Sequence, residues 1–308
     1  MTTQLFGDRV DRWLLKKGFR AQRPLSTLRL IEARRMFADP IGYARSLQKA
    51  RTVTKESGYA DYIPKDAGYR LFGPSEFPET ADVVRACLAV YSKHEAELTG
   101  EKQVNKRYFY NILTEEDLRE HPVLIDFALS KAMSEIATGY LGQVPRLASL
   151  GVFYSEINDT IGGSQLFHVD GDALAQVKCF VNVWDVGEGG GAFTFLPKAD
   201  TSDSLRNGGL LKIVSDAELD RVAPKAEKIA AVGAAGSGVF VDTSRCLHQG
   251  SRARLRARLV FQFQYVSRPD ALLARQSGAR VAGGHINVSA QHLQGVSLGN
   301  PKAAMFIG

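Results

Sequence analysis

Two histidines and an aspartate have the types and spacing of ligands for one metal ion. His168-Val169-Asp170 places an imidazole and a carboxylate two residues apart, and on an extended segment both side chains point to the same side. His248 lies 78 residues after Asp170 and follows a predicted strand at 238–241. If the fold returns His248 beside the first pair, two nitrogens and one oxygen occupy one face of an ion, which is typical of iron(II) oxygenases. We therefore predict that these three residues bind a metal at a catalytic centre.

The other histidines carry weaker signals. His94 and His121 lie on or beside predicted helices, where a packed or surface histidine is the commoner case. His285 and His292 lie in an irregular tail, where exposure is the default. An H-x-D pair is also common by chance, so whether it indicates a metal site depends on the segments around it.

Those segments have the period-2 apolar alternation of β-strands. The predicted strands cover 147–157, 177–184, 192–196, 229–232, 238–241 and 257–266. Helical periodicity dominates before Pro145 instead. Helices followed by closely spaced strands predict a mainly β fold with α additions, in which helices pack outside a β-sandwich or barrel.

The first half is expected to supply the helices. Amphipathic helices are predicted within 8–50, with breaks near Pro24 and Pro40, and an irregular connection over 51–78. Two more are predicted from Glu79 to about Glu97 and from Pro122 to Tyr140, the second ended by Gly142. We expect one structural domain: a helical region at 1–145, a catalytic core at 146–268 and an irregular extension at 269–308.

The order of the predicted strands and of the candidate ligands makes residues 146–266 resemble the double-stranded β-helix core (jelly-roll, cupin-like) of the phytanoyl-CoA dioxygenase family. His168, Asp170 and His248 match that family's iron ligands, and Arg258 matches the arginine that binds the far carboxylate of 2-oxoglutarate. The resemblance implies an Fe(II)- and 2-oxoglutarate-dependent dioxygenase that uses O2 and releases succinate and CO2. The implied reaction is hydroxylation of an unactivated C–H bond in a small-molecule, carrier-linked or nucleotide-linked substrate.

The same resemblance implies co-substrate contacts for Gln165 and Thr194. The chain departs from the family at 197–200, where Gly-Ser-His usually follows the proline, and at 237–238, where an acid is often found. These departures predict a changed turn rather than lost iron binding, because that histidine is not a ligand. Halogenating relatives lack the carboxylate that Asp170 keeps, so hydroxylation is favoured, with desaturation or ring chemistry still open.

Alternation in the last strand supports the role of Arg258. Leu259, Phe261, Phe263 and Tyr265 fall on one face, expected to pack on helices, and Arg258 falls on the other with Val260, Gln262 and Gln264. A guanidinium on the cavity side can clamp a carboxylate with two parallel hydrogen bonds. If the register of the strand is shifted, Arg256 would take this role instead of Arg258. The plainer interpretation is that these arginines are solvated charges in a loop and at the edge of the sheet.

Substrate contacts are less well defined. Lys178, Phe180, Asn182 and Trp184 share one face of a strand, and we expect Phe180 and Trp184 to be core residues. Lys178, Asn182 and Tyr154 are the candidate substrate residues, with 105–108 as a further candidate segment. A buried ammonium is costly without a partner, so Lys178 is expected to meet an acidic group of the substrate or co-substrate, or to reach water at the strand end.

Composition is that of a soluble globular enzyme. The 308 residues are 44% hydrophobic and 23% charged, with no apolar run near the roughly 20 residues of a membrane span. The N-terminus lacks the apolar stretch of a secretory signal, and Cys87, Cys179 and Cys246 suggest free thiols in a reducing compartment. We expect a cytoplasmic protein.

Positive charge is concentrated in residues 1–55, which hold thirteen Lys and Arg against four Asp and Glu. Such an arm can meet an anionic partner, although a solvated helix face is the more ordinary interpretation. The segment lacks stacking aromatics and any nucleic-acid motif, so nucleic-acid binding is not predicted.

Two other functions stay open. A cupin-like metalloenzyme that does not use 2-oxoglutarate would need the three ligands but not Arg258. A non-catalytic ligand-binding relative would need neither, and the intact ligand set disfavours it.

Overall fold

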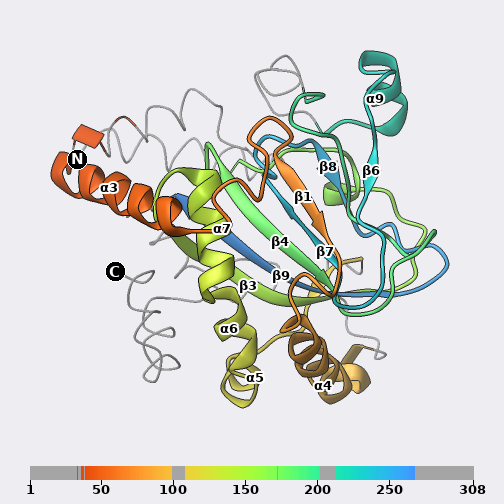
Figure 1. Ribbon diagram of the computed structural model, residues 1–308. Coiled ribbons are helices and arrows are strands. Elements are labelled where there is room, and N and C mark those ends of the chain that lie inside the picture. The colour runs from red at the N-terminus through yellow and green to blue at the C-terminus, as the bar shows by residue number, and fades with distance from the viewer. Residues whose placement is uncertain are drawn as a thin grey trace, which may run out of the picture.

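Helices cover one face of a large antiparallel sheet in the computed structural model (Figure 1). The structure describes residues 33, 36–37, 39–98, 108–171, 173–201 and 213–267. Among these, a six-stranded sheet has the order β1-β7-β4-β9-β3-β2 and a three-stranded sheet the order β6-β5-β8. The strands are β1 (Tyr69–Phe72), β2 (Tyr110–Asn111), β3 (Pro145–Ser155), β4 (Gln176–Asn182), β5 (Thr194–Phe195), β6 (Ile229–Ala230), β7 (Gly238–Val241), β8 (His248–Gln249) and β9 (Arg258–Ser267).

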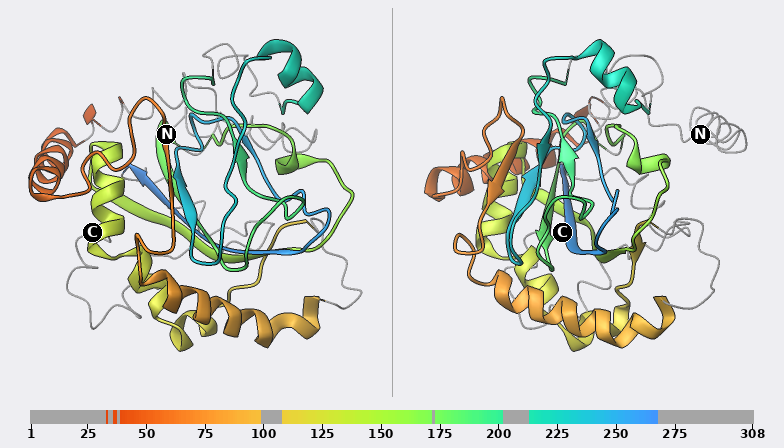
Figure 2. Two further views of the ribbon diagram at one scale, coloured as in Figure 1. Left: turned by 45° about the vertical axis from the view of Figure 1, so that its right-hand side comes forward. Right: turned by 90° about the vertical axis from the view of Figure 1, so that its right-hand side faces the viewer.

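The helices gather mainly at one side of the large sheet. They are α3 (Pro40–Glu56), α4 (Thr80–Leu98), α5 (Glu115–Glu120), α6 (Val123–Ala128), α7 (Lys131–Leu141), α9 (Asp216–Val222) and the 3-10 turn η1 (Gly163–Gln165). Figure 2 shows α9 at the opposite end of the molecule from α4. In the described ranges, no helix is both long enough and apolar enough to cross a membrane.

Strand β9 forms the boundary between two cores. Leu259, Phe261, Phe263 and Tyr265 are buried against the helices, as predicted. Val260, on the other face, belongs to a second cluster between the sheets that includes Phe193 and Phe195. The alternation in the sequence therefore gives the correct side for every residue of this strand that was assigned.

One predicted boundary is confirmed and another is corrected. A helix boundary lies near Pro40, as predicted: Pro40 begins α3, because a proline fits the first turn, where its missing N–H has no acceptor. Asp39 caps that turn by accepting from Gly42 N at 2.8 Å. The segment 51–78 is not wholly irregular, since α3 continues to Glu56 and β1 lies within it.

The helix predicted over 122–140 is divided into α6 and α7. Ser130 causes the division, because its hydroxyl accepts from Met133 N and starts a new helix there. Gly142 ends α7 with a φ of 67°, which favours glycine, as expected. None of the three cysteines forms a disulfide, as the sequence suggested, and all three are buried.

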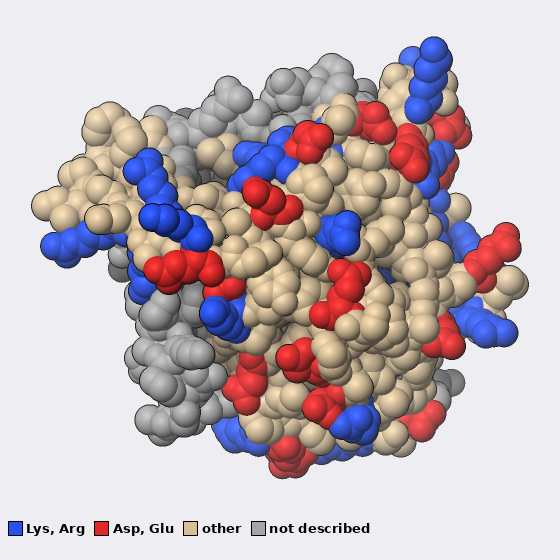
Figure 3. All heavy atoms as spheres, viewed as in Figure 1, with Lys and Arg blue, Asp and Glu red and all other residues tan. Residues whose placement is uncertain are grey.

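Some predictions fall outside the described residues. These are the helices expected before residue 33, the candidate segment at 105–107 and the extension at 269–308. On the face shown in Figure 3, basic and acidic side chains of the described residues are interspersed rather than gathered into one basic patch.

Candidate metal centre

A short antiparallel bridge brings His168 and His248 together. Each backbone N–H donates to the other residue's carbonyl at 2.8 Å, and Asp170 N donates to Thr243 O at 2.8 Å. Directly opposed residues of an antiparallel pair project their side chains to the same face. His248 is also opposite Phe195 of β5, whose side chain lies in the cluster between the sheets. Both imidazoles therefore face the interior, and Asp170, two residues beyond His168, joins them.

The distances among the three side chains suit one ion. His168 Nε2 lies 3.9 Å from Asp170 Oδ1, and His248 Nε2 lies 3.8 Å from Asp170 Oδ2. Ligand atoms about 2 Å from an ion and at right angles to one another lie roughly 3 Å apart. Small side-chain rotations thus suffice to close the site. Among the described residues, this is the only group of three or more His, Cys, Asp or Glu side chains placed to hold a metal.

Both imidazoles are held in the tautomer that a metal needs. His168 Nδ1 is 2.8 Å from Leu166 O, and His248 Nδ1 is 2.9 Å from Cys246 O. A carbonyl only accepts, so each Nδ1 carries the proton and each Nε2 keeps its lone pair. The same geometry, with the carbonyl two residues earlier, serves both histidines.

The protonation states also suit metal binding. Burial, followed by the neighbouring His168, lowers the pKa of His248 to about 3, so this ring is neutral near pH 7. Burial alone would raise the pKa of Asp170. Lys178, His248 and His168 together outweigh it and hold that pKa well below its usual range. A neutral nitrogen and an ionised oxygen are therefore ready as ligands.

Lys178 and Gln176 of β4 both contact the Asp170 carboxylate. Lys178 Nζ lies 2.8 Å and Gln176 Nε2 lies 3.1 Å from Oδ2 of Asp170. The sequence led us to expect an acidic group of the substrate or co-substrate, or water, beside Lys178, whereas the structure places the carboxylate of Asp170 there. Gln176 was not among the sequence candidates, although its position two residues before Lys178 puts it on the same strand face.

Arg258 is buried at the start of β9 with part of its guanidinium unpaired. Its side chain is among the largest fully buried ones, and Nη1 donates to Gly191 O at 3.2 Å. In the part of the chain that the structure describes, Nε and Nη2 are buried without a hydrogen-bond partner. Burial lowers the pKa of Arg258 to about 10, so the group stays charged near pH 7. Burying a charge without a partner costs free energy, so this guanidinium is a candidate binding site for an anion. Arg256 is exposed, which removes it as a substitute.

Gln165 anchors a loop through its side-chain amide. Its Nε2 donates to Asn158 Oδ1 at 2.9 Å and to Ser251 O at 3.0 Å. Its Oε1 accepts from Thr160 Oγ1 and from Gly162 N. The amide makes these four hydrogen bonds within the protein, and a co-substrate contact by Gln165 stays a prediction.

Thr194 lies on the face of β5 opposite to that of Phe195, the residue paired with His248. Thr194 is opposite Gln249, whereas the next residue, Phe195, is opposite His248. Neighbouring residues of a strand point to opposite faces, so Thr194 points away from the metal ligands.

Two substrate candidates, Tyr154 and Asn182, contact other parts of the protein. Tyr154 lies on the helical side of the large sheet, with its ring 5.5 Å from Tyr91 of α4 and 6.2 Å from Trp184. Asn182 is buried, and its amide donates to Ser237 Oγ at 3.3 Å. Neither is placed beside the three ligands. Phe180 stacks on Phe193 at 4.4 Å, as expected of a core residue.

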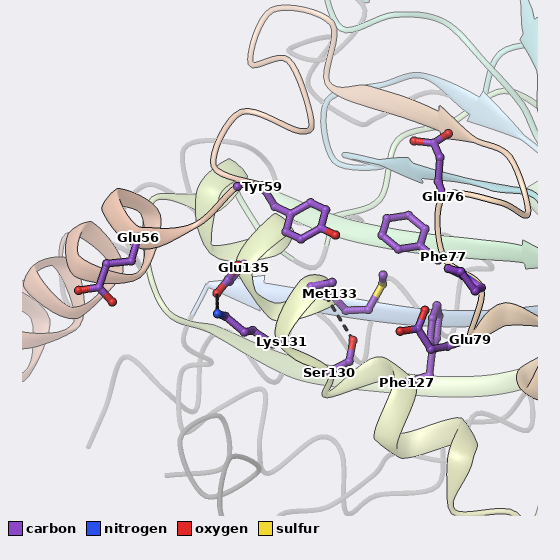
Figure 4. Close-up of a pocket in the computed structure, with 13 residues that line it drawn as sticks. Glu56, Tyr59, Glu76, Phe77, Glu79, Phe127, Ser130, Lys131, Met133 and Glu135 are labelled. Atoms are coloured by element: carbon purple, nitrogen blue, oxygen red, sulfur yellow. Dashed lines mark hydrogen bonds and ion pairs between the residues drawn. The ribbon is translucent and has the colours of Figure 1, made fainter.

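A separate hollow of about 460 Å³ lies on the helical side (Figure 4). Tyr59 and Phe77 form part of its wall, together with several glutamates. Glu135 is held by Ser57 Oγ at 2.7 Å, and Glu76 by Tyr62 OH at 2.9 Å. None of the three candidate metal ligands lines this hollow.

Comparisons with known proteins give similar solved structures only. No family model and no curated protein matches the chain. One similar structure is the epimerase SnoN in complex with Fe3+, alpha ketoglutarate and nogalamycin RO, at 18% identity and a TM-score of 0.46, covering 79% of this chain and 93% of that chain. Another is the non-heme alpha ketoglutarate dependent carbocyclase SnoK from nogalamycin biosynthesis, at 17% identity and a TM-score of 0.47, covering 75% and 94%. A third is EctD from S. alaskensis with bound Fe, at 14% identity and a TM-score of 0.47, covering 74% and 86%. At such low identities and TM-scores, the similar structures do not indicate which reaction this chain catalyses. We therefore argue its chemistry from its own residues.

Proposed function

We propose that this protein is an Fe(II)- and 2-oxoglutarate-dependent oxygenase with a double-stranded β-helix core at 146–268. The helical region at 1–145 would pack on that core. One observation carries the proposal: His168, Asp170 and His248 lie together on an interior face, with each Nδ1 bonded to a backbone carbonyl and the carboxylate ionised. Two nitrogens and one oxygen on one face of an ion leave the opposite positions open, as iron(II) oxygenases require.

Arg258 supports 2-oxoglutarate as the co-substrate. Its buried Nε and Nη2 offer two N–H groups in the planar geometry that matches a carboxylate. A dicarboxylate that binds the metal at one end would bring its other end to this guanidinium. Burial in the apolar cluster around Phe193 and Val260 strengthens such an ion pair, because the surroundings screen it weakly.

The chemistry follows from these parts. Iron(II) with 2-oxoglutarate and O2, when bound, supplies the oxidation of an unactivated C–H bond, with release of succinate and CO2. His168, Asp170 and His248 would hold the ion from one side, and Arg258 would orient the co-substrate. Phe193, whose ring is 5.2 Å from that of His248, helps to exclude water from the site. Because Asp170 keeps the position that a halide would need, we propose hydroxylation of a small-molecule substrate.

The proposal is tested by anaerobic absorption spectroscopy of the purified protein with iron(II) and then 2-oxoglutarate. We expect a weak visible charge-transfer band that needs both additions and is lost in His168→Ala. Arg258→Met should need roughly 10- to 100-fold more 2-oxoglutarate for the same band, because hydrogen bonds to charged groups contribute about 1.5–3 kcal/mol.

The matched control is Arg256→Met, which removes an exposed arginine two residues away and should leave the titration unchanged. A folded wild-type protein that gives no band would contradict the proposal. Iron binding without any response to 2-oxoglutarate would instead indicate a cupin-like metalloenzyme of another reaction class.

A further inference from the structure

The two oxygens of the Asp170 carboxylate have different surroundings. Oδ2 accepts from Lys178 Nζ at 2.8 Å and from Gln176 Nε2 at 3.1 Å. Each oxygen lies near one imidazole, Oδ1 at 3.9 Å from His168 Nε2 and Oδ2 at 3.8 Å from His248 Nε2, but within the described residues Oδ1 accepts no hydrogen bond. One oxygen is therefore held by two donors, and the other is available to an ion.

A buried hydrogen-bond chain fixes the orientation of Gln176. Gln264 Nε2 donates to Gln176 Oε1 at 2.8 Å, and Ser149 Oγ donates to Gln264 Oε1 at 3.2 Å. Because its Oε1 is an acceptor there, Gln176 must present its NH2 group to Asp170. That group also donates to Thr243 Oγ1 at 2.6 Å. Gln176 is fully buried, so its amide has no water to exchange with.

Lys178 is held in place by the large sheet. It lies in β4 opposite Val241 of β7 and Gln264 of β9, and its side chain is only 14% exposed. The ammonium therefore cannot move far from the carboxylate. Its charge stays beside whatever ion Asp170 binds, in a weakly screening interior.

We propose that Lys178 and Gln176 are positioning residues that keep Oδ2 of Asp170 off the metal, so that the carboxylate binds through Oδ1 alone. Binding through one oxygen leaves three positions of an octahedral ion open instead of two. The charge of Lys178 has a second effect: it weakens binding of the divalent cation and strengthens binding of an anion at the open positions. The inference rests on the proposed metal centre but not on 2-oxoglutarate or on any substrate.

The test uses cobalt(II) as a spectroscopic metal and azide as a simple anion, on the full chain with Lys178→Met. Methionine keeps the length of the side chain and removes its charge. We expect the cobalt dissociation constant to fall about tenfold and the azide dissociation constant to rise about tenfold, because one like charge near the ion is removed. The visible cobalt spectrum should also change, since Oδ2 loses the stronger of its two donors and can approach the ion.

Two further variants separate positioning from general damage. Lys178→Arg, which keeps the charge, should restore azide binding to within a few-fold of wild type. Lys198→Met is the matched control, because Lys198 contacts the Lys65 carbonyl and not Asp170, and it should change nothing. Thermal denaturation of each variant confirms that it is folded.

The opposite signs of the two changes make the outcomes distinct. If Lys178→Met weakens both cobalt and azide binding, Lys178 only supports local structure and the inference is overturned. Unchanged constants and an unchanged spectrum overturn it as well, while wild-type cobalt binding leaves the proposed metal centre intact. Wild-type protein that binds no cobalt would overturn the metal centre itself.

Discussion

At the residue scale, what could be predicted depended on whether the spacing alone determines which way a side chain points. His168 and Asp170 share a side because they are two residues apart. The alternation along β9 likewise placed Arg258 and Phe261 on different faces of that strand. Gln165, Thr194 and Tyr154 were placed by resemblance or proximity, which does not specify a strand face. Gln176 was missed because a polar residue at the start of a strand carries no signal until its neighbours across the sheet are known.

Arg258 should lower the stability of the protein when no co-substrate is bound. Its guanidinium is buried with two unpaired N–H groups, and replacing a buried charge by an apolar side chain of similar volume often stabilises by about 1–4 kcal/mol. Arg258→Met should therefore raise the free energy of unfolding of the ligand-free protein, measured by urea denaturation. The control Arg256→Met should stay within about 0.5 kcal/mol of wild type, since that side chain is exposed. A less stable Arg258→Met protein would show that the guanidinium is already compensated.

At the element scale, the strands within predicted apolar segments were found, including β5 and β6 inside 192–196 and 229–232, whereas β1, β2 and β8 were not predicted. β3, β4, β7 and β9 lie within a few residues of their predicted positions, because alternation over several residues is specific. β8 has two residues, so it has no period to detect, and it exists because β5 pairs with it. The same limit applies to α5, whose six residues are set by a capping box at Thr114 and Asp117.

Asp117 links α5 to α4 and gives the stability a pH dependence. It is fully buried and accepts from Thr114 N at 2.8 Å, with His94 Nε2 at 2.9 Å and Lys93 Nζ at 3.0 Å. Burial alone would raise its pKa, but hydrogen bonds from Thr114, His94 and Lys93 hold the pKa well below the usual range. The folded state thus binds this proton less tightly than the unfolded chain, so the stabilisation is present above about pH 4 and is lost as the pH falls further.

Asp117→Asn should therefore cost about 2 kcal/mol at pH 7, a typical value for a cap that is also a charged hydrogen-bond acceptor. The difference from wild type should shrink as the pH falls below 4, measured by urea denaturation at pH 7 and pH 3. Glu115→Gln, at a largely exposed position of the same turn, should differ little at either pH. A difference that stays constant with pH would mean that the Asp117 charge does not contribute.

At the scale of the whole molecule, the large sheet separates packing from chemistry. The face that carries Phe263 and Leu150 is buried by α4, α6 and α7, and the other face carries the buried Arg258 and Lys178, which contacts Asp170 of the candidate metal centre. The sequence predicted this division because helices precede strands along the chain. It could not predict how the two short strands β5 and β8 approach the large sheet, since that depends on contacts between segments far apart in the chain.

Metal binding should therefore stabilise the molecule as a whole, because the ligands come from segments 78 residues apart that only the folded chain brings together. A ligand that binds the folded state alone, at 100 times its dissociation constant, adds about 2.7 kcal/mol to the free energy of unfolding. For a chain of this size, cobalt(II) should raise the Tm by roughly 5–10 °C. His168→Ala should abolish the rise, whereas His121→Ala, at the end of α5 and away from the site, should retain it. An equal rise in His168→Ala would place the stabilising ion elsewhere on the protein and would remove the basis for assigning these three residues as its ligands.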